Sequence, residues 1–352
     1  MTEPSTTAAS PMSLQQDVTD AGAPAGSRRP RRAFRLPPYS GPLVALVLMC
    51  VVLSLFRPFF FSTANITNVL VTNAPLMIVA IGMTIAMISG GFDLSVGATL
   101  AATGITLHLA LTSGLPGPVA ILVALLTGVA LGALVNGPLI AGLKLNFFVV
   151  TLGTMTTLTG VVYVVSGGQT KTIDSDAVFT MGNGELFGIP VPIVVIVLAF
   201  AASWLLLNLT PLGRNIYAVG GSREAARLSG IRVAAITITV YAVCGLLASV
   251  AGVVQAGLLT AASPTVGTTI ALTAGAAVLL GGTSFSGGSG TVTGTVVGVL
   301  VIAVLQNGLG LFGVASYWQD VLTGFVLIVA VALDQFHRVA RRRAKAPVIA
   351  TS

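Results

Sequence analysis

A short polar segment interrupts a long apolar stretch of the chain. It reads GGFDLSVG over residues 90–97, and Asp93 is the only charged residue between Arg57 and Lys144. The double glycine predicts the end of one helix, because glycine reaches left-handed backbone angles at little steric cost. Asp93 can then cap the following helix by accepting hydrogen bonds from its free backbone amides.

Two interpretations of this segment stay open from the residues alone. An ionisable side chain within a membrane region is a candidate for binding or proton transfer. In that case Gly90, Gly91, Asp93 and Ser95 would line a translocation path or move when it opens. In the other interpretation, Asp93 only caps a helix close to the membrane surface, where its charge costs little.

A second polar segment, residues 210–232, carries signals for the start and the end of a helix. Ser222 can cap a short helix, Glu224 falls in its first turn, and Gly230 can end it. A short amphipathic helix of this kind suits docking into a groove of a soluble partner. A loop whose charges only orient the chain in a membrane is the alternative, but it needs no caps at both ends.

Glycines and isolated polar residues mark further candidates. Gly290, Gly294 and Gly298 recur every four residues, which predicts one helix face against which a neighbouring helix packs closely. The segments around 90–97 and 281–288 also resemble each other faintly. Four polar or aromatic side chains in apolar surroundings could line a path or pack between helices: Asn73, Phe148, Gln255 and Asn307.

The sequence lacks the motifs of several kinds of enzyme and binding site. None of the three lysines follows a glycine, so a GK[ST] phosphate loop is absent and ATP would have to bind another chain. No GxSxG, HExxH or cysteine cluster is present, and Cys50 and Cys244 stand alone in apolar runs. We therefore expect no catalytic residues, no metal site and no cofactor bound to this chain.

The composition is that of an integral membrane protein. Of the 352 residues, 55% are hydrophobic and 8% are charged, whereas a soluble domain carries about 25% charged residues. No charge occurs between Arg232 and Asp320. The 41 glycines and 17 prolines favour a helical bundle over a β-barrel. The net charge of +7 does not indicate nucleic-acid binding, because the basic residues lie beside apolar segments.

Apolar segments of about 20 residues predict an all-α, polytopic transmembrane bundle of about ten spans. Residues 1–38 are predicted to be a disordered cytoplasmic tail, residues 39–336 the membrane domain, and residues 337–352 a basic cytoplasmic tail. The predicted spans are 41–57, 69–89, 94–112, 117–138, 148–166, 189–209, 233–256, 270–283, 291–312 and 318–334. The third and eighth are the weakest, and eight spans would also fit.

The basic residues predict the orientation of these spans. With both termini in the cytoplasm, fifteen of the seventeen lysines and arginines face the cytoplasm, and only Arg57 and Lys171 lie outside. This agrees closely with the positive-inside rule. The segment 210–232 is then cytoplasmic, and the largest outside loop covers residues 167–188.

Several motifs in the same order resemble the permease subunits of bacterial ATP-binding-cassette (ABC) importers of the ribose, xylose and galactoside type. The resemblance covers roughly residues 40–335. The matching stretches are GGFDLSVG at 90–97, PLGRNIYAVGGSREAARLSGIRV at 211–233, CGLLASVAGVVQ at 244–255, LGGTSFSGGSGTVTGT at 280–295 and QNGLGLFGVASYWQ at 306–319.

The resemblance implies a multi-pass subunit of the bacterial plasma membrane that moves a sugar or a related small polar solute and is not itself an enzyme. Its implied partners are a cytoplasmic ABC ATPase that binds ATP and magnesium, an external solute-binding protein, a second permease copy or paralogue, and membrane lipid. The loop 210–232 would be the coupling helix that contacts the ATPase. Its implied coupling residues are Arg214, Glu224, Ala225, Ala226 and Gly230.

The chain departs from the family pattern at three positions. Ala271 and Thr273 stand where the family often carries acidic residues, and Ser289 replaces a common lysine. The departures leave open which solute is carried, including a nucleoside, a polyol or a branched-chain amino acid. A different class, a proton-coupled secondary transporter that uses Asp93, is the further alternative.

Overall fold

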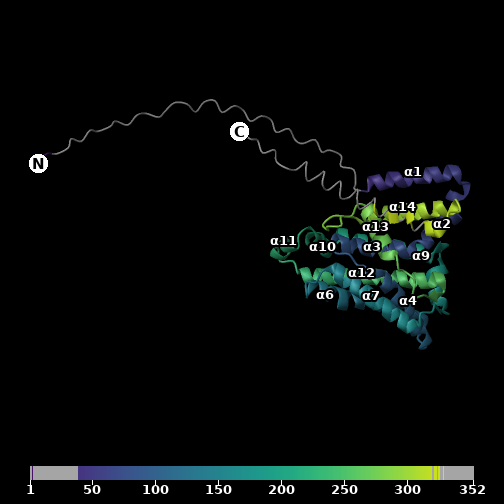
Figure 1. Cartoon of the computed structure of the whole chain (residues 1–352), viewed down its shortest axis with the longest axis horizontal. Helices are drawn as coiled ribbons and strands as arrows, with labels where there is room; N and C mark the ends of the chain where they lie inside the picture. Colours follow the sequence, from purple (N-terminus) through teal and green to yellow (C-terminus); the bar gives the residue numbers. More distant parts are fainter. Residues whose placement is uncertain (1, 3–38, 319–320, 323, 326–327, 329–352) are drawn as a thin grey trace, which may run out of the picture. The chain divides into compact units, whose positions relative to one another are not determined.

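The computed structural model describes residues 39–318, together with residues 2, 321, 322, 324, 325 and 328. Within this part the chain is mainly helical (Figure 1). In chain order the elements are α1 (Ser40–Phe56), η1 (Pro58–Phe61), α2 (Thr63–Thr72), α3 (Ala74–Ile88), α4 (Val96–Thr112), α5 (Gly117–Ala130), η2 (Leu131–Asn136), α6 (Gly137–Ala141), α7 (Phe147–Ser166), β1 (Lys171–Thr172), α8 (Asp176–Asn183), β2 (Glu185–Leu186), β3 (Ile189–Pro190), α9 (Val191–Leu209), α10 (Pro211–Gly221), α11 (Arg223–Leu228), α12 (Val233–Leu259), β4 (Ala261–Ala262), α13 (Ile270–Leu280) and α14 (Val292–Leu311).

The helical bundle predicted from the sequence is confirmed in its coarse form. Two small antiparallel strand pairs, β1 with β4 and β2 with β3, are the exception to an all-α fold in the described residues. Each of the first nine predicted apolar segments coincides with a helix or with consecutive helices. The tenth segment, 318–334, and the tails 1–38 and 337–352 fall largely outside the described residues.

The described helices differ in their ability to cross a membrane. Five are long and apolar enough, when α5, η2 and α6 count as one helix. The pair α2 and α3, bent by 51° at Asn73, would make a sixth. The helices α1, α4 and α13 are apolar but shorter, so the number of about ten spans remains a prediction.

The centre of the bundle is built on α3 and α12. Every residue of α3 from Ala74 to Ile88 is buried, which fits its apolar composition on all sides. The 27-residue α12 packs against α3, α4 and α5. Outer helices instead expose large apolar side chains such as Val44, Leu55 and Val197, as expected of helices that face lipid or another membrane protein.

A π-helical turn, η2, follows α5 where it meets α12. Methyl groups at Gly128 or Gly132 would overlap the carbonyl oxygens of Gly245 or Tyr241, so glycine allows the two helices to approach closely. Turns of this kind are rare and occur often at functional sites. Here the turn ends at Asn136, whose side chain reaches the polar segment between α3 and α4.

The predicted eighth span has an unusual form. Its helix, α13, has only 11 residues and extends about 16 Å. Residues 263–269, which precede it, form turns rather than a helix. The chain between α12 and α14 is thus part non-helical segment and part short helix, which explains why the apolar run there is short.

Candidate functional site

The double glycine ends α3 as predicted. Gly90 adopts a positive φ of 80°, and its amide donates to the carbonyl of Met87 at 3.0 Å. The amide of Gly91 donates to the carbonyl of Ala86 at 3.0 Å. These two bonds close the last turn of the helix in the arrangement typical of a glycine cap.

Asp93 lies in a buried polar cluster and is only 2% exposed. Its Oδ1 accepts hydrogen bonds from the amide nitrogen of Ser95 at 2.9 Å and from the Ser95 hydroxyl. The side-chain amide nitrogen of Asn136 donates to Ser95 Oγ at 2.9 Å and lies 3.5 Å from Asp93 Oδ2. Thr154 Oγ1 donates to Asn136 Oδ1 at 2.7 Å. The cluster therefore joins the turn before α4 to η2 and α7.

The expectation that Asp93 caps the next helix is wrong in its register. The helix α4 begins at Val96, its N-cap is Ser95, and no side chain accepts a capping hydrogen bond there. Asp93 instead closes a tight turn with Ser95, three residues before the first residue of the helix. Asn136 and Thr154 were not identified from the sequence; their only signal was that each is a polar residue in an apolar segment.

Two glycine turns and the end of α10, from distant parts of the chain, meet at one place, which we call the glycine junction and define as Gly90, Gly220, Gly287 and Gly288. The amide of Gly288 donates to the carbonyl of Ile88 at 2.8 Å. A methyl group on Gly287 would lie 2.8 Å from both Gly90 Cα and the Gly220 carbonyl oxygen. The end of α10 is therefore in backbone contact with the end of α3 and with the loop between α13 and α14.

Two side-chain contacts accompany the glycine junction. The hydroxyl of Tyr217, on α10, donates to the carbonyl of Gly290 at 2.8 Å. The rings of Phe92 and Phe285 lie 6.1 Å apart between centroids. The two faintly similar segments, 90–97 and 281–288, thus lie against each other, and α10 rests on both.

The segment 210–232 folds as two short helices with the predicted caps. Ser222 Oγ accepts from the amide of Ala225 at 3.2 Å and so caps α11. At the other end Gly230 has a φ of 80°, and the amide of Ile231 donates to the carbonyl of Ala226 at 3.0 Å. Both predicted helix boundaries are confirmed.

The exposed face of α11 carries one ion pair. Arg227 donates to Glu224 Oε1 at 2.8 Å, and both side chains are largely exposed. The Arg227 guanidinium, through this hydrogen bond and its charge, holds the pKa of the Glu224 carboxyl below its usual range. Glu224 therefore carries its charge throughout the neutral pH range.

The expected coupling residues differ in exposure. Arg214, Glu224 and Ala225 are exposed, and Gly230 ends the helix. Ala226 is 4% exposed and packs into the core, so it does not offer a surface to a partner in this conformation. Leu228, which was not predicted from the sequence, is 78% exposed at the end of α11.

The isolated candidates for the path do not gather in one place. Asn73 donates to the carbonyl of Val69 at 2.9 Å where α2 meets α3. Asn307 and Asn65 exchange two amide hydrogen bonds, of 2.9 and 3.1 Å, between α14 and α2. Phe148, at the start of α7, is 52% exposed. Helix pairing and capping account for the two asparagines.

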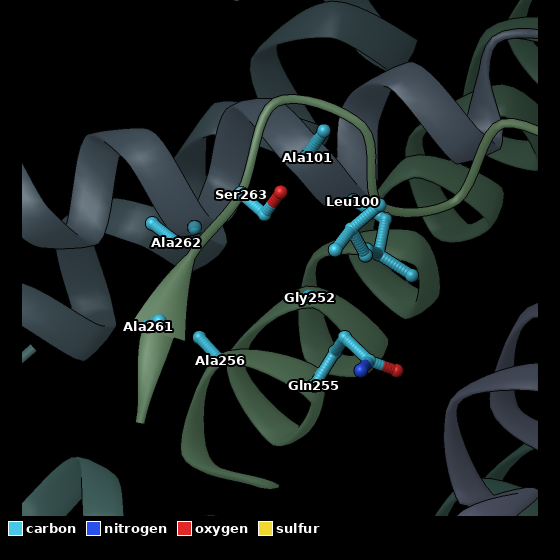
Figure 2. Close-up of a pocket in the computed structure, with 10 residues that line it drawn as sticks. Leu100, Ala101, Gly252, Gln255, Ala256, Ala261, Ala262 and Ser263 are labelled. Carbon is cyan, nitrogen blue, oxygen red and sulfur yellow. The ribbon is translucent and has the colours of Figure 1, made fainter. Parts of the chain in front are cut away.

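Gln255 borders a small pocket between α4, α12 and β4. Figure 2 shows Gln255 on α12 below the pocket and Ser263, after β4, above it. The cavity measures about 10 Å³ and is lined otherwise mainly by glycine, alanine and aliphatic residues. It has room for about one water molecule, so in this conformation it does not admit a larger solute.

The predicted glycine face on α14 exists in part. Methyl groups on Gly294 and Gly298 would overlap the carbonyl oxygens of Gly281 and Ala277, which brings α13 and α14 into close contact. The prediction is wrong for Gly290, because α14 begins at Val292 and Gly290 lies in the preceding loop. There, its Cα faces the side chain of Thr283.

Comparison with known proteins agrees with this architecture. Residues 65–331 match the protein family described as "Branched-chain amino acid transport system / permease component". The chain belongs to this family. The permease is therefore a multi-pass membrane subunit of an ABC importer, a class of transport subunits rather than enzymes. No solved structure matches it.

Individual relatives cover most of the permease. It is 41% identical to the ribose import permease protein RbsC of Escherichia coli (strain K12) over 296 residues, which are 83% of this chain and 92% of the relative. Identity to RbsC of Bacillus subtilis (strain 168) is 42% over 297 residues, 84% of this chain and 92% of the relative. Identity to the L-arabinose transport system permease protein AraH of Escherichia coli (strain K12) is 33% over 327 residues, 90% and 97%.

Proposed function

We propose that the permease imports a sugar of the pentose or hexose class. The observation that carries this proposal is the similarity to permeases named for ribose and L-arabinose across more than four fifths of the chain. A permease for a nucleoside, a polyol or a branched-chain amino acid is the second candidate, and the family description favours the last of these.

The transport cycle requires partners that bind elsewhere. A permease of this family works with an ATPase and an external binding protein. We place ATP and magnesium on the ATPase, and expect the permease to pair with a second copy or paralogue within the lipid bilayer. ATP binding can drive transport only if the ATPase binds one conformation of the permease more tightly than the other.

The segment 210–232 is the proposed contact with the ATPase. Its helix α11 presents the charged pair Glu224–Arg227 and the exposed Leu228, a combination of an apolar anchor with polar neighbours that suits a protein interface. The neighbouring α10 touches the end of α3 and the loop between α13 and α14 through the glycine junction. A displacement of α10 by the ATPase would therefore reach both turns directly.

The secondary-transporter alternative finds little support in the geometry of Asp93. A proton carrier must alternate between two aqueous sides. Asp93 is 2% exposed and its carboxylate is held by Ser95 and Asn136. These contacts favour a role in shaping the turn before α4.

Purification from native membranes tests the proposed function. The tagged permease, solubilised gently, is expected to bring down an ATPase that hydrolyses ATP. Reconstituted with that ATPase and the external binding protein, the permease should take up labelled D-ribose or L-arabinose only when ATP is supplied. Uptake that follows a proton gradient and ignores ATP would refute the assignment, and ATP-dependent uptake of leucine but of neither sugar would favour the second candidate.

The variant Glu224→Lys tests the proposed docking surface. Reversing this charge is expected to reduce the copurifying ATPase by at least about tenfold, because like charges brought together across an interface cost several kcal/mol. The helix itself should persist, since an exposed ion pair contributes only about 0–1 kcal/mol. The measurement is the ratio of ATPase to permease after affinity purification.

Glu185→Lys is the matched control. Glu185 is also exposed but lies on β2, in the loop predicted to face outside. It should leave the ATPase ratio unchanged. Equal loss in both variants would mean that the change of net charge, rather than contact at α11, weakens the complex.

A further inference from the structure

The turns between β4 and α13 lie deep inside the membrane domain. A methyl group on Gly97 would overlap the carbonyl oxygen of Gly267, so these two residues are in direct contact. Gly97 is near the start of α4, about 22 Å along the helix axis from its other end at Thr112. The hydrocarbon core of a bilayer is about 30 Å thick.

A second measure of depth comes from the other side of the segment. Gly298 contacts Ala277, so these residues lie at the same level of α14 and α13. Ile270 is about 10 Å further along α13, and Gly298 is about 9 Å from the start of α14 at Val292. Ile270 therefore lies about 20 Å from that end of the bundle. Together, the two measures place residues 267–270 about 20 Å from each end of the bundle, and so in the interior of a domain that spans the bilayer.

The same segment leaves polar groups without partners. Within the part of the chain that the structure describes, no hydrogen bond satisfies the backbone amides of Gly267, Thr268 and Thr269. The hydroxyls of Thr268 and Thr269 also lack partners there, and both residues are exposed. Thr265 is exposed too, and its hydroxyl pairs with Ser263 Oγ at 3.0 Å.

Irregular backbone at this depth excludes contact with lipid. Unsatisfied peptide groups are costly in hydrocarbon, so non-helical segments occur at membrane depth only where protein covers them or where they line an aqueous cavity. Three exposed threonines on seven consecutive residues would be an unusual protein-covered surface. They match a path that passes a hydrated, hydroxyl-rich solute.

We propose that residues 263–269 form the wall of the translocation path at mid-membrane, with the hydroxyls of Thr265, Thr268 and Thr269 as hydrogen-bonding groups for a polyhydroxylated solute. The inference rests on the proposed function and adds the solute-contacting residues to it. Gln255 lines the small pocket together with Ser263 and Val266, and so lies next to this wall.

Cysteine labelling tests the wall without requiring ATP or the ATPase. Thr268→Cys and Thr269→Cys, in a background with Cys50 and Cys244 replaced by alanine, are treated in membranes with a water-soluble methanethiosulfonate reagent. Both thiols are expected to react, because a thiol in an aqueous path can ionise to the reactive thiolate. Val197→Cys, on the exposed apolar face of α9, is the control and should stay unmodified.

Two results would contradict the proposal that residues 263–269 line the path. The first is absence of modification at both threonine positions. The second is a spontaneous disulfide between two copies of the Thr268→Cys variant, which would show that a second permease covers this face. Added D-ribose or L-arabinose, whichever the wild-type permease takes up, should slow the modification. Unchanged rates of modification at a saturating sugar concentration would show that these threonines do not contact the solute.

Uptake by hydroxyl-deletion variants gives a separate readout. Thr268→Val and Thr269→Val keep the shape but lose the hydroxyl, and each should raise the solute concentration for half-maximal uptake about two- to tenfold, as expected for one lost hydrogen bond. Thr156→Val is the matched control, because Thr156 is exposed on α7 but its hydroxyl bonds the carbonyl of Leu152 at 3.0 Å. Equal uptake in all three variants would contradict the proposal, whereas failure of ATP-dependent uptake in the wild type would refute the proposed function instead.

Discussion

Replacing Gly220 by alanine is expected to uncouple ATP hydrolysis from solute uptake. A methyl group at this position would overlap the carbonyl oxygen of Ile88 and lie 2.6 Å from the amide nitrogen of Gly288. Both neighbours are backbone atoms, so the contact can be relieved only if α10 moves away from the glycine junction. Overpacking of this kind costs about 1–3 kcal/mol, which is roughly a five- to 150-fold shift toward the displaced position.

The adjacent glycine supplies the control for this prediction. Gly221→Ala makes the same chemical change one residue later, where an added methyl group meets no atom within 4 Å. The measurement is the number of solute molecules imported per ATP hydrolysed, together with the amount of permease in the membrane. Gly220→Ala should lower the ratio at least about fivefold and Gly221→Ala should not.

The outcome separates coupling from folding. Suppose that the Gly220→Ala variant reaches the membrane in normal amount and binds the ATPase, yet imports little solute. That result would agree with transmission of motion through the glycine junction. A normal ratio of solute to ATP in Gly220→Ala would mean that α10 passes its motion to the bundle by another route. Loss of the protein from the membrane would be tested further with Tyr217→Phe, which removes only the hydrogen bond to Gly290.

Local signals in the sequence predicted local structure well. The caps of α11 at Ser222 and Gly230, and the end of α3 at Gly90, depend on a few neighbouring residues, and all three are confirmed. The register of Asp93 was missed because α4 begins only at Val96, so that Asp93 accepts from the Ser95 amide before the helix instead of from an amide in its first turn. The same holds for Gly290, which precedes α14 instead of joining its glycine face.

The parts of the site that depend on tertiary contact could not be predicted. Asn136 lies at the end of η2 and bonds Ser95, which is 41 residues away in sequence, so the contact depends on tertiary packing. Tyr217 and Gly220 gain their role from a loop about 70 residues away in sequence. The exposed threonines before α13 were not identified from the sequence, because the sequence alone gives no measure of depth.

Asp93→Ala is expected to destabilise the permease strongly. It would leave the amide and the hydroxyl of Ser95 without their buried acceptor. Each buried group left unsatisfied costs about 1–3 kcal/mol, so the apparent melting temperature in detergent should fall by roughly 5–10 °C. Asp174→Ala, at an exposed carboxylate in the loop predicted to lie outside, should change it little.

Asp93→Asn separates this structural role from proton coupling. The amide keeps an oxygen that can accept from the Ser95 backbone, so the melting temperature should fall less than in Asp93→Ala, and ATP-dependent uptake should persist at a reduced level. A proton carrier behaves differently, because an amide at this position cannot take up and release a proton, and uptake would stop although the fold is intact. A stable Asp93→Asn permease without any uptake would therefore support a role of Asp93 in proton transfer along the translocation path.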